Sequence, residues 1–554
     1  MRTVRTVIVV AALLAHAGSA WPQTRASEVL IPAGPFHGVH GLAFAADGTL
    51  LAADIMGMTV HAVNVANGAR RVLVGPTAGM ADDVAVAPPG TPNAGTVVWT
   101  GVAVGRLYAR DTSGKVRVVA ENLPAINTVG FAPDGPLYAT QFDDRGNVLW
   151  RIDLSGGGAH EKVWEDTKGL NGFVIAPDGY LYGPQADLGR VIRLDLNTLD
   201  IKVIATGFTW PTGVKMDLSG GPNDGTLYAV DFEAGALHRI DKGSGAVETL
   251  AMLEPGLDNL AVGPNGKVYV SSITRNGIFE VDPATRIVRA VAQGALTAPG
   301  GVAVVDGASE SRGPLVFVAD MFSLRAIDGR TGAMRTLAWP GKVSLYPSNV
   351  SAAVLNGRPA AVVTSWFTGT LAVLDGTSGE VLRRETGLAQ PHDTVMLADG
   401  AILVAETGAK RLTHVAPDGA RTARPMVFNA PVGLALAANG AVFVTDAGTG
   451  QVLRSAPPFD AVTVVAGGLG RPEGIAVMPD GRLAVVDSAR GEVAAIDPAT
   501  GAKDELVTLV ALIPTAPAPF APTWIHNGVA AGADGTLYLP SDRQAALYRI
   551  VTKR

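Results

Sequence analysis

Short runs of alternating apolar and polar residues recur along the chain and predict β-strands throughout. The segment from Gly41 to Asp54 reads as an apolar strand, an Asp-Gly turn and a second apolar strand, and the pattern returns at residues 172–182 and 474–487. Asp-Gly and Asn-Gly suit primed hairpin turns, which need a positive φ at both central residues. A third strand follows each hairpin, as at residues 191–195. A fourth follows a glycine-containing turn, as at residues 203–205.

This repeat predicts the whole fold. Four strands per unit at a mean spacing of about 43 residues are typical of β-propeller blades. The first strands of the twelve units open at His40, Asp82, Asn127, Asn171, Thr212, Asp258, Gly300, Asn349, His392, Val432, Glu473 and Asn527. Because propellers typically hold four to eight blades, we predict an all-β fold of tandem six-bladed β-propellers with twelve four-stranded blades. A single large ring is the alternative.

The two ends of the chain bear on the domain boundary. The last unit ends at residues 548–550 without a fourth strand, whereas residues 28–31 look like a fourth strand with no unit before it. Since an unpaired edge is costly, each ring needs a closing strand. The simplest solution pairs residues 28–31 with unit six and residues 287–292 with unit twelve, which predicts propellers at 21–286 and 287–554. If residues 28–31 instead pair with unit twelve, the boundary moves to about residue 297.

The first twenty residues predict export. Arg2 and Arg5 precede the apolar run Val7 to Ala15, and residues 18–20 offer small side chains at a cleavage site. The run is shorter than the ~20 residues that span a bilayer, which favours a cleaved signal peptide over a membrane anchor. We therefore expect a signal peptide at residues 1–20, a periplasmic or secreted protein, and no stable membrane span after cleavage.

Composition and charge remove several function classes. The net charge is -6, and charged residues make up 17% of the chain against roughly 25% in an average globular protein. This balance argues against a nucleic-acid binder with a basic face. The absence of cysteine excludes a disulfide framework, a zinc ribbon and a thiolate nucleophile. The nine histidines and the many Asp, Asn and Glu residues remain for chemistry.

The residues that open the first strands carry the candidate chemistry. In most units the opening residue lies seven positions before the Asp or Asn of the turn, as His40 does before Asp47. The openers therefore occupy equivalent places and converge at one mouth of the central channel. In the first ring all six openers are polar. Two Asp and two Asn side chains supply the oxygens that calcium prefers. Magnesium is the alternative, but it demands a tighter octahedral arrangement of its ligands. The predicted metal ligands are Asp82, Asn127, Asn171 and Asp258.

The second ring offers an alternative site. Its polar candidates are Asn349, His392, Asp393, Glu473 and Asn527, with His526 alongside. This set is thinner for a hard cation, although its histidines and Glu473 suit a softer metal. In either ring, the polar openers would also be explained if they only hydrogen-bond to water in the channel.

Two further patterns have a structural and a functional interpretation. An Asp ends the second strand of many units, too regularly for catalysis, and we predict that these residues are hydrogen-bond fixtures between blades: Asp54, Asp231, Asp320, Asp446, Asp487 and Asp542. Trp210, Trp366 and Trp524 fall near strand ends or loops. They would line a pocket for an apolar ligand or pack between blades.

Two stretches resemble a known family. Asn171-Gly-Phe-Val-Ile-Ala-Pro-Asp-Gly-Tyr-Leu-Tyr and Leu257-Asp-Asn-Leu-Ala-Val resemble the first-strand openings of the six-bladed gluconolactonase, senescence-marker-protein and paraoxonase hydrolases, and the blades look like NHL-type repeats. The resemblance implies a central calcium, held by Glu, Asn and Asp, that polarises a lactone or ester carbonyl. Asn127 and Asn171 match the family's Asn-bearing blades. His40 stands in place of its first-blade Glu, and Thr212 in place of its fifth-blade Asp.

Together these features predict an exported, metal-dependent hydrolase of a small-molecule lactone or ester. The cation would polarise the carbonyl, and His40 would act as the base because its ordinary pKa lies near the working pH. Asp258 is the second catalytic candidate. Two alternatives stay open, a non-catalytic double propeller that binds a ligand or a protein partner, and a lyase similar to streptogramin lyases.

Overall fold

The structure is a computed structural model that describes residues 27–75, 79–143, 146–155, 160–340, 346–508 and 525–551. The described residues form twelve antiparallel four-stranded sheets, as the repeat predicts. The helical segments that lie wholly within these ranges are the 3-10 turns η2 (Val102–Val104), η3 (Ala186–Leu188) and η4 (Asp542–Gln544). No helix within these ranges is long and apolar enough to cross a bilayer. The predicted signal peptide at residues 1–20 and Trp524 lie outside the described residues.

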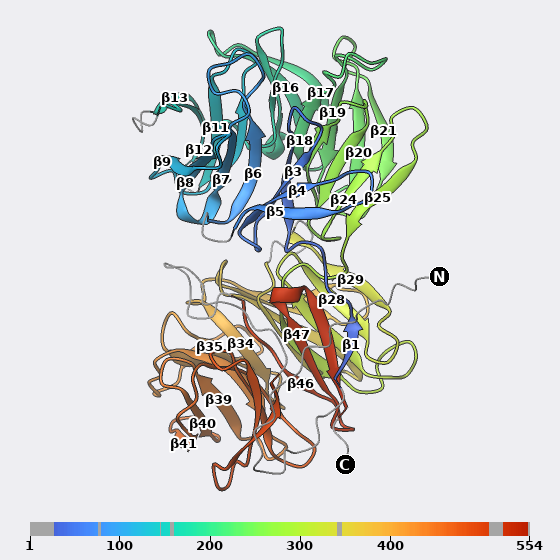
Figure 1. The fold of residues 1–554 in the computed structure, drawn as a ribbon. Coiled ribbons are helices and arrows are strands. Elements are labelled where there is room, and N and C mark those ends of the chain that lie inside the picture. Colours follow the sequence, from blue (N-terminus) through green and yellow to red (C-terminus); the bar gives the residue numbers. More distant parts are fainter. Residues whose placement is uncertain are drawn as a thin grey trace, which may run out of the picture.

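Six sheets form the first propeller, the upper body in Figure 1. Their strands, blade by blade, are β2 (Val39–Phe44), β3 (Leu50–Asp54), β4 (Thr59–Val63), β5 (Arg70–Val74); β6 (Ala81–Val86), β7 (Val97–Gly101), β8 (Arg106–Arg110), β9 (Val116–Ala120); β10 (Ile126–Phe131), β11 (Leu137–Asp143), β12 (Gly146–Ile152), β13 (His160–Glu165); β14 (Val174–Ile175), β15 (Tyr180–Gln185), β16 (Arg190–Asp195), β17 (Ile201–Thr206); β18 (Pro211–Met216), β19 (Leu227–Asp231), β20 (Ala236–Ile240), β21 (Val247–Met252); and β22 (Leu257–Val262), β23 (Val268–Ser272), β24 (Gly277–Val281), β25 (Val288–Gln293).

The other six sheets form the second propeller, the lower body in Figure 1. Their strands are β26 (Pro299–Val305), β27 (Leu315–Asp320), β28 (Ser323–Asp328), β29 (Met334–Ala338); β30 (Asn349–Leu355), β31 (Arg358–Ser365), β32 (Thr370–Asp375), β33 (Val381–Glu385); β34 (Pro391–Met396), β35 (Ile402–Glu406), β36 (Arg411–Val415), β37 (Arg421–Ala423); β38 (Pro431–Leu436), β39 (Val442–Asp446), β40 (Gln451–Ser455), β41 (Thr463–Ala466); β42 (Pro472–Val477), β43 (Leu483–Asp487), β44 (Glu492–Ile496), β45 (Lys503–Val507); and β46 (Ala530–Ala531), β47 (Leu537–Ser541), β48 (Ala546–Ile550), β1 (Ser27–Ile31).

Each group of six closes into a ring around its first strands. In the first propeller every first strand contacts the next one along the chain, and β22 returns to contact β2. In the second propeller β46 returns in the same way to β26. The apolar core lies between neighbouring blades, where buried Leu107 of β8 packs with Leu137 of β11. The predicted tandem six-bladed fold is confirmed.

The predicted assignment of the closing strand is wrong. Strand β1 pairs antiparallel with β48 of unit twelve, with Val29 opposite Tyr548. Strand β25 pairs with β24 and completes unit six from its own chain segment. The first propeller therefore extends to Gln293, beyond the predicted boundary at residue 286. Strands β24 and β25 are consecutive, so they pair through a short turn. The edge of β48 is instead covered by the N-terminal strand β1, which satisfies its backbone groups.

The carboxylates that end the second strands hold the chain as it enters each blade. Asp320 Oδ1 accepts hydrogen bonds from the backbone N–H of Thr297 and of Ala298, both at 2.8 Å. Asp446 binds the backbone at Asn429 and Ala430 in the same way, at 2.7 and 2.8 Å. These buried carboxylates satisfy backbone donors in the segment between two blades, which confirms their predicted structural role for these residues.

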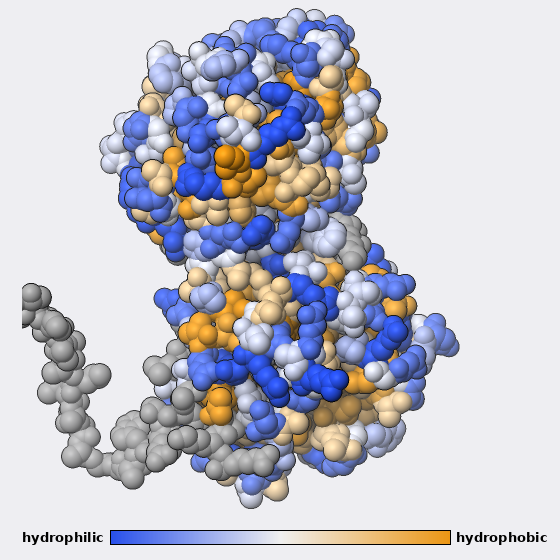
Figure 2. Space-filling view, turned by 90° about the vertical axis from the view of Figure 1, so that its right-hand side faces the viewer, coloured by the Kyte–Doolittle hydropathy of each residue, from blue (hydrophilic) through white to orange (hydrophobic). Residues whose placement is uncertain are grey.

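The faces on which the first strands begin lie against each other. A mixed apolar cluster joins loops of the first propeller, around Ile55, Phe232 and Ile273, to Phe322 and Trp366 of the second. Both bodies meet at a narrowed waist in the space-filling view (Figure 2). The Arg325 guanidinium also donates a hydrogen bond across this junction to the carbonyl of residue 274. The mouths of both channels therefore open toward the junction between the propellers.

Removing β1 tests the closure of the second ring. We expect deletion of residues 1–31 to lower the unfolding temperature by roughly 5 °C or more, because β48 loses the backbone partner that covers its edge. Hydrogen exchange followed by mass spectrometry should show faster exchange in β47 and β48 and unchanged exchange in β24 and β25. The matched control is deletion of residues 1–26 alone. Faster exchange in β24 rather than β48 would show that β1 closes the first ring.

Candidate functional site

A bulge near the start of most first strands turns two consecutive side chains toward the channel. In β2 the register shifts between Val39 and Leu42, so that His40 and Gly41 lie opposite one residue of β3. The same shift occurs in β6 and in β22, between Leu257 and Leu260. Bulges of this kind re-aim side chains and are frequent beside functional sites. They explain why, in these blades, both the opening residue and the residue after it lie at the channel.

The histidine of the first blade joins two carboxylates from different blades. His40 Nδ1 lies 3.0 Å from Asp82 Oδ1 and 3.4 Å from Asp258 Oδ2. His40 and Asp82 are buried, whereas the Asp258 side chain keeps 20% of its surface exposed. The second ring nitrogen of His40, Nε2, is buried and has no hydrogen-bond partner among the described residues. The structure thus brings together three of the predicted site residues.

The two carboxylates change the protonation of this histidine. Burial lowers the pKa of His40, but the negative charges of Asp258 and Asp82 and the hydrogen bond to Asp82 outweigh it and raise the pKa to about 9. Burial raises the pKa of Asp258 to about 6, and the positive charge of His40 opposes that rise. At neutral pH, His40 is therefore an imidazolium and Asp258 a carboxylate. This differs from the predicted role of His40 as a base.

The remaining polar openers of the first ring, Asn127, Asn171 and Thr212, hydrogen-bond to other residues of their own or a neighbouring blade. Thr128 Oγ1 donates a hydrogen bond of 2.7 Å to Asn171 Oδ1, and it also lies 3.1 Å from Asn127 Oδ1. Thr212 Oγ1 donates to the carbonyl of Leu257 at 3.0 Å. The two asparagine oxygens that were predicted as metal ligands therefore converge on one hydroxyl group.

Below this layer, residues outside the predicted ligand set bind each other across the channel. Asn259 Nδ2 donates to Asp83 Oδ1 across the channel at 3.1 Å, from strands 176 residues apart. Burial raises the pKa of Asp83 to about 7, and Lys215, buried in the same channel, opposes that rise. A Cβ at Gly41 would lie 2.1 Å from Asp83 Oδ1, so only glycine leaves room there. The Asp-Asp and Asp-Asn pairs at 82–83 and 258–259 were the available signal for these second residues.

The second propeller covers the mouth of the first with aromatic side chains. The rings of His40 and Phe322 lie 5.4 Å apart, and Phe322 in turn contacts Tyr346. Burial and the negative charges of Asp258 and Asp82 raise the pKa of Tyr346, which places its hydroxyl near these carboxylates. The cluster continues through Phe367 to Trp366, whose ring stacks on His392 at 6.3 Å. Trp366 is thus part of the wall between the two channel mouths.

The alternative site in the second ring is divided into separate groups. Glu473 is fully buried and bound by Arg471 Nε at 2.8 Å and by Asn527 Nδ2 at 2.7 Å. Asp393 accepts the backbone N–H groups of Thr394 and Leu434 at 2.7 and 2.8 Å. Burial lowers the pKa of His392 to about 3, so that this histidine is neutral. The structure therefore does not gather the five predicted residues around one point.

The first-ring residues, as arranged, do not fit the predicted calcium ion. An imidazolium nitrogen lies between the two carboxylates that would have to bind the cation, and Thr128 engages both asparagine oxygens. A hard cation needs six to eight oxygens directed at one point. No group of three or more His, Asp or Glu side chains within the described ranges has a metal-binding arrangement. The positive charge of His40 balances the carboxylates instead.

The comparison with known families supports the predicted resemblance for the first propeller. Residues 21–229 match the family model described as the SMP-30/gluconolactonase/LRE-like region, a match that spans the first four blades and ends within β19 of the fifth. The chain matches no curated protein. Residues 21–229 therefore share the sequence pattern of this family.

Several solved structures are similar to part or most of the chain. Regucalcin from Agrobacterium tumefaciens, a calcium-binding protein, is 22% identical over 45% of this chain and 85% of its own, with a TM-score of 0.35. Virginiamycin B lyase from Staphylococcus aureus is 17% identical over 50% of this chain and 91% of its own, at 0.29. The extracellular domain of a one-component system from B. thetaiotaomicron is 11% identical over 96% and 84%, at 0.31.

The protonation of His40 can be measured directly. We expect ¹⁵N NMR to show a doubly protonated His40 ring up to a pH of about 9, because two carboxylates surround it. Since this pKa exceeds the ordinary value of 6.5, the stabilisation from His40 is complete below pH 6.5 and is lost as the pH rises through 9. In the Asp258→Asn variant the pKa of His40 should fall. Titration near 6.5 in the unmodified protein would contradict the ion pairs.

Proposed function

We propose that the protein is a hydrolase of small-molecule lactones or esters and that its site lies at the mouth of the first propeller. The observation that carries the proposal is His40, held between Asp82 and Asp258 in the ring whose sequence matches the gluconolactonase-like family. We also propose that the protein is exported to the periplasm or secreted, on the basis of the signal sequence at residues 1–20.

Asp258 and His40 would divide the proton transfers of hydrolysis between them. The partly exposed Asp258 carboxylate accepts a proton from water, and the water oxygen forms a bond to the carbonyl carbon. The N–H at His40 Nε2 stabilises the negative charge that develops on the carbonyl oxygen. When the carbon–oxygen bond of the ester breaks, His40 transfers its proton to the leaving alkoxide. Asp82 keeps the His40 ring in place through Nδ1.

The burial of His40 Nε2 beneath Phe322 favours a second candidate function. A nitrogen that is covered in the resting structure reaches substrate only if the propellers separate at their junction. A non-catalytic protein that binds a ligand or a partner between the two propellers needs no such contact with His40. A lyase would use the same acid and base, but water oxygen would not enter its product.

Isosteric replacement tests the site. We expect Asp258→Asn and His40→Gln each to lower kcat/KM toward a panel of lactones and aryl esters by roughly a hundredfold, because each removes one proton transfer. The rate should rise as the pH passes about 6 and fall above about 9, when Asp258 is ionised and His40 is still protonated. Reactions in ¹⁸O water should label the acid product.

The matched controls locate the site. Asp393→Asn makes the same change in the second ring, and Asp480→Asn makes it at a largely exposed turn. Both should keep the activity of the unmodified protein. Loss of activity in Asp393→Asn alone would move the site to the second propeller, an unlabelled product would favour a lyase, and no turnover of any compound would favour the binding function.

Calcium dependence is tested separately. Because His40 lies between the carboxylates, we expect a chelator to leave the unfolding temperature and the hydrolysis rate unchanged. The His40→Glu variant, which restores the family's residue at this position, should gain stability when calcium is added. Binding of calcium by the unmodified protein, with a rise in its unfolding temperature, would show that His40 leaves its observed position.

A further inference from the structure

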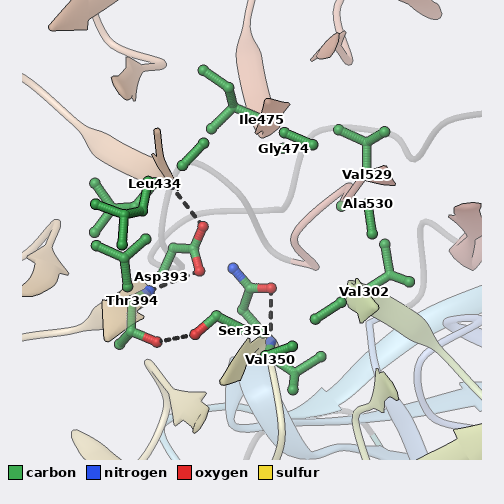
Figure 3. Close-up of a pocket in the computed structure, with 18 of the residues that line it drawn as sticks. Val302, Val350, Ser351, Asp393, Thr394, Leu434, Gly474, Ile475, Val529 and Ala530 are labelled. Atoms are coloured by element: carbon green, nitrogen blue, oxygen red, sulfur yellow. Dashed lines mark hydrogen bonds between the residues drawn. The ribbon is translucent and has the colours of Figure 1, made fainter. Parts of the chain in front are cut away.

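The central channel of the second propeller contains an open cavity. Its volume is about 260 Å³, and all six first strands of this ring line it. Figure 3 shows Val302, Leu434, Ile475 and Val529 around the space, with Ser351 and Thr394 on one side. Most of the residues that line it are apolar, although polar atoms supply more than half of its exposed surface. The channel of the first propeller is crossed by the Asn259–Asp83 hydrogen bond.

Two sequence differences distinguish the two channels. Lys215 of unit five donates a hydrogen bond to the carbonyl of Phe173 at 2.7 Å, and its positive charge acts on Asp83. It corresponds to Ala476 of unit eleven, since each pairs with the residue three positions before the Asp that ends the second strand. Asn259 of unit six corresponds to Gly528 of unit twelve, because each directly follows the opening residue. The second ring therefore has neither this lysine nor the asparagine that crosses the first channel.

Polar groups without partners lie at one end of the cavity. His526 Nδ1 and Asn349 Nδ2 are buried, line the cavity, and make no hydrogen bond of normal geometry to any described residue. Asn349 also lies close enough to Asp393 to lower the pKa of that carboxyl, although burial dominates and raises it. A buried polar atom without a partner is destabilising, and a bound oxygen atom would remove this penalty.

The charges around the cavity select a neutral ligand. No Lys or Arg lines it, so it offers no attraction to an anion. Its one acidic residue, Asp393, already receives two backbone N–H groups, and burial lowers the pKa of His526 to about 4, which leaves that ring uncharged. Asn349 offers a donor, and His526 Nδ1 is a donor or an acceptor depending on its tautomer. A hydroxyl or carbonyl oxygen satisfies both.

We propose that the channel of the second propeller binds a small, neutral, apolar molecule that carries one hydroxyl or carbonyl oxygen. The oxygen would meet Asn349 and His526, and the apolar body would lie along Ala476, Ile475 and Val529. The first strands run away from the propeller junction and end near Leu436, which is 37% exposed, so the ligand would enter from the far face. This site is separate from His40 and does not depend on the proposed hydrolysis.

Calorimetry with simple probes tests this site on the full-length protein. We expect cyclohexanol and cyclohexanone to bind with one site per chain and to show chemical-shift changes confined to the second ring. Cyclohexanecarboxylate should bind at least tenfold more weakly, because no Lys or Arg lines the cavity to compensate its charge. Equal or tighter binding of a charged probe would overturn the proposed ligand class, and no binding of either neutral probe would overturn the site.

Two variants place the probe in the channel. Ala476→Leu should abolish binding, because the larger side chain occupies the cavity, whereas Ala423→Leu on the exposed outer strand β37 is the matched control and should bind normally. Asn349→Ala should weaken cyclohexanol binding by roughly fivefold and leave methylcyclohexane, which has no oxygen, unaffected. Unfolding temperatures verify that each variant folds. Normal binding by a folded Ala476→Leu protein would show that the probe binds elsewhere.

Discussion

The pairing of β1 with β48 determines how the two propellers are connected. A closing strand taken from the far end of the chain completes the second ring and forces residues 32–38 back across the junction to begin the first ring. The chain crosses between the propellers again after β25. Two crossings at one junction hold the channel mouths together, and this is why Phe322 and Tyr346 of one ring lie over His40 of the other.

Most of the fold was accessible from the sequence because its signals are local. Asp-Gly turns, strand alternation and the regular Asp at the end of second strands act within one blade and repeat, so twelve blades could be counted. The closing strand was not accessible, because residues 28–31 have the same pattern whether they pair with unit six or unit twelve. That choice depends on which edge remains uncovered once all the hairpins have formed.

The candidate site was predicted in part. The equal spacing of the opening residues indicated that His40, Asp82 and Asp258 lie together at the mouth of the first channel, and the structure places them there. The bulges that also turn Asp83 and Asn259 inward leave no mark in the spacing, because an extra residue in the strand is seen only against its partner. The protonation of His40 depends on its distances to Asp82 and Asp258, which lie on two other blades. The ordinary pKa of histidine therefore did not predict its role. For the same reason, a set of suitable ligand types did not imply a calcium site.

The dependence of the second ring on β1 also has a consequence for how the protein matures. A ribosome makes β1 first and β48 almost last, whereas the first ring is one continuous stretch that is complete when Gln293 has emerged. Domains generally fold as units during synthesis, N-terminal first. Here, however, the earliest strand must wait beside an already folded body for a partner that is still untranslated. The two rings are thus finished at different times, and the second is finished only after β48 has been made.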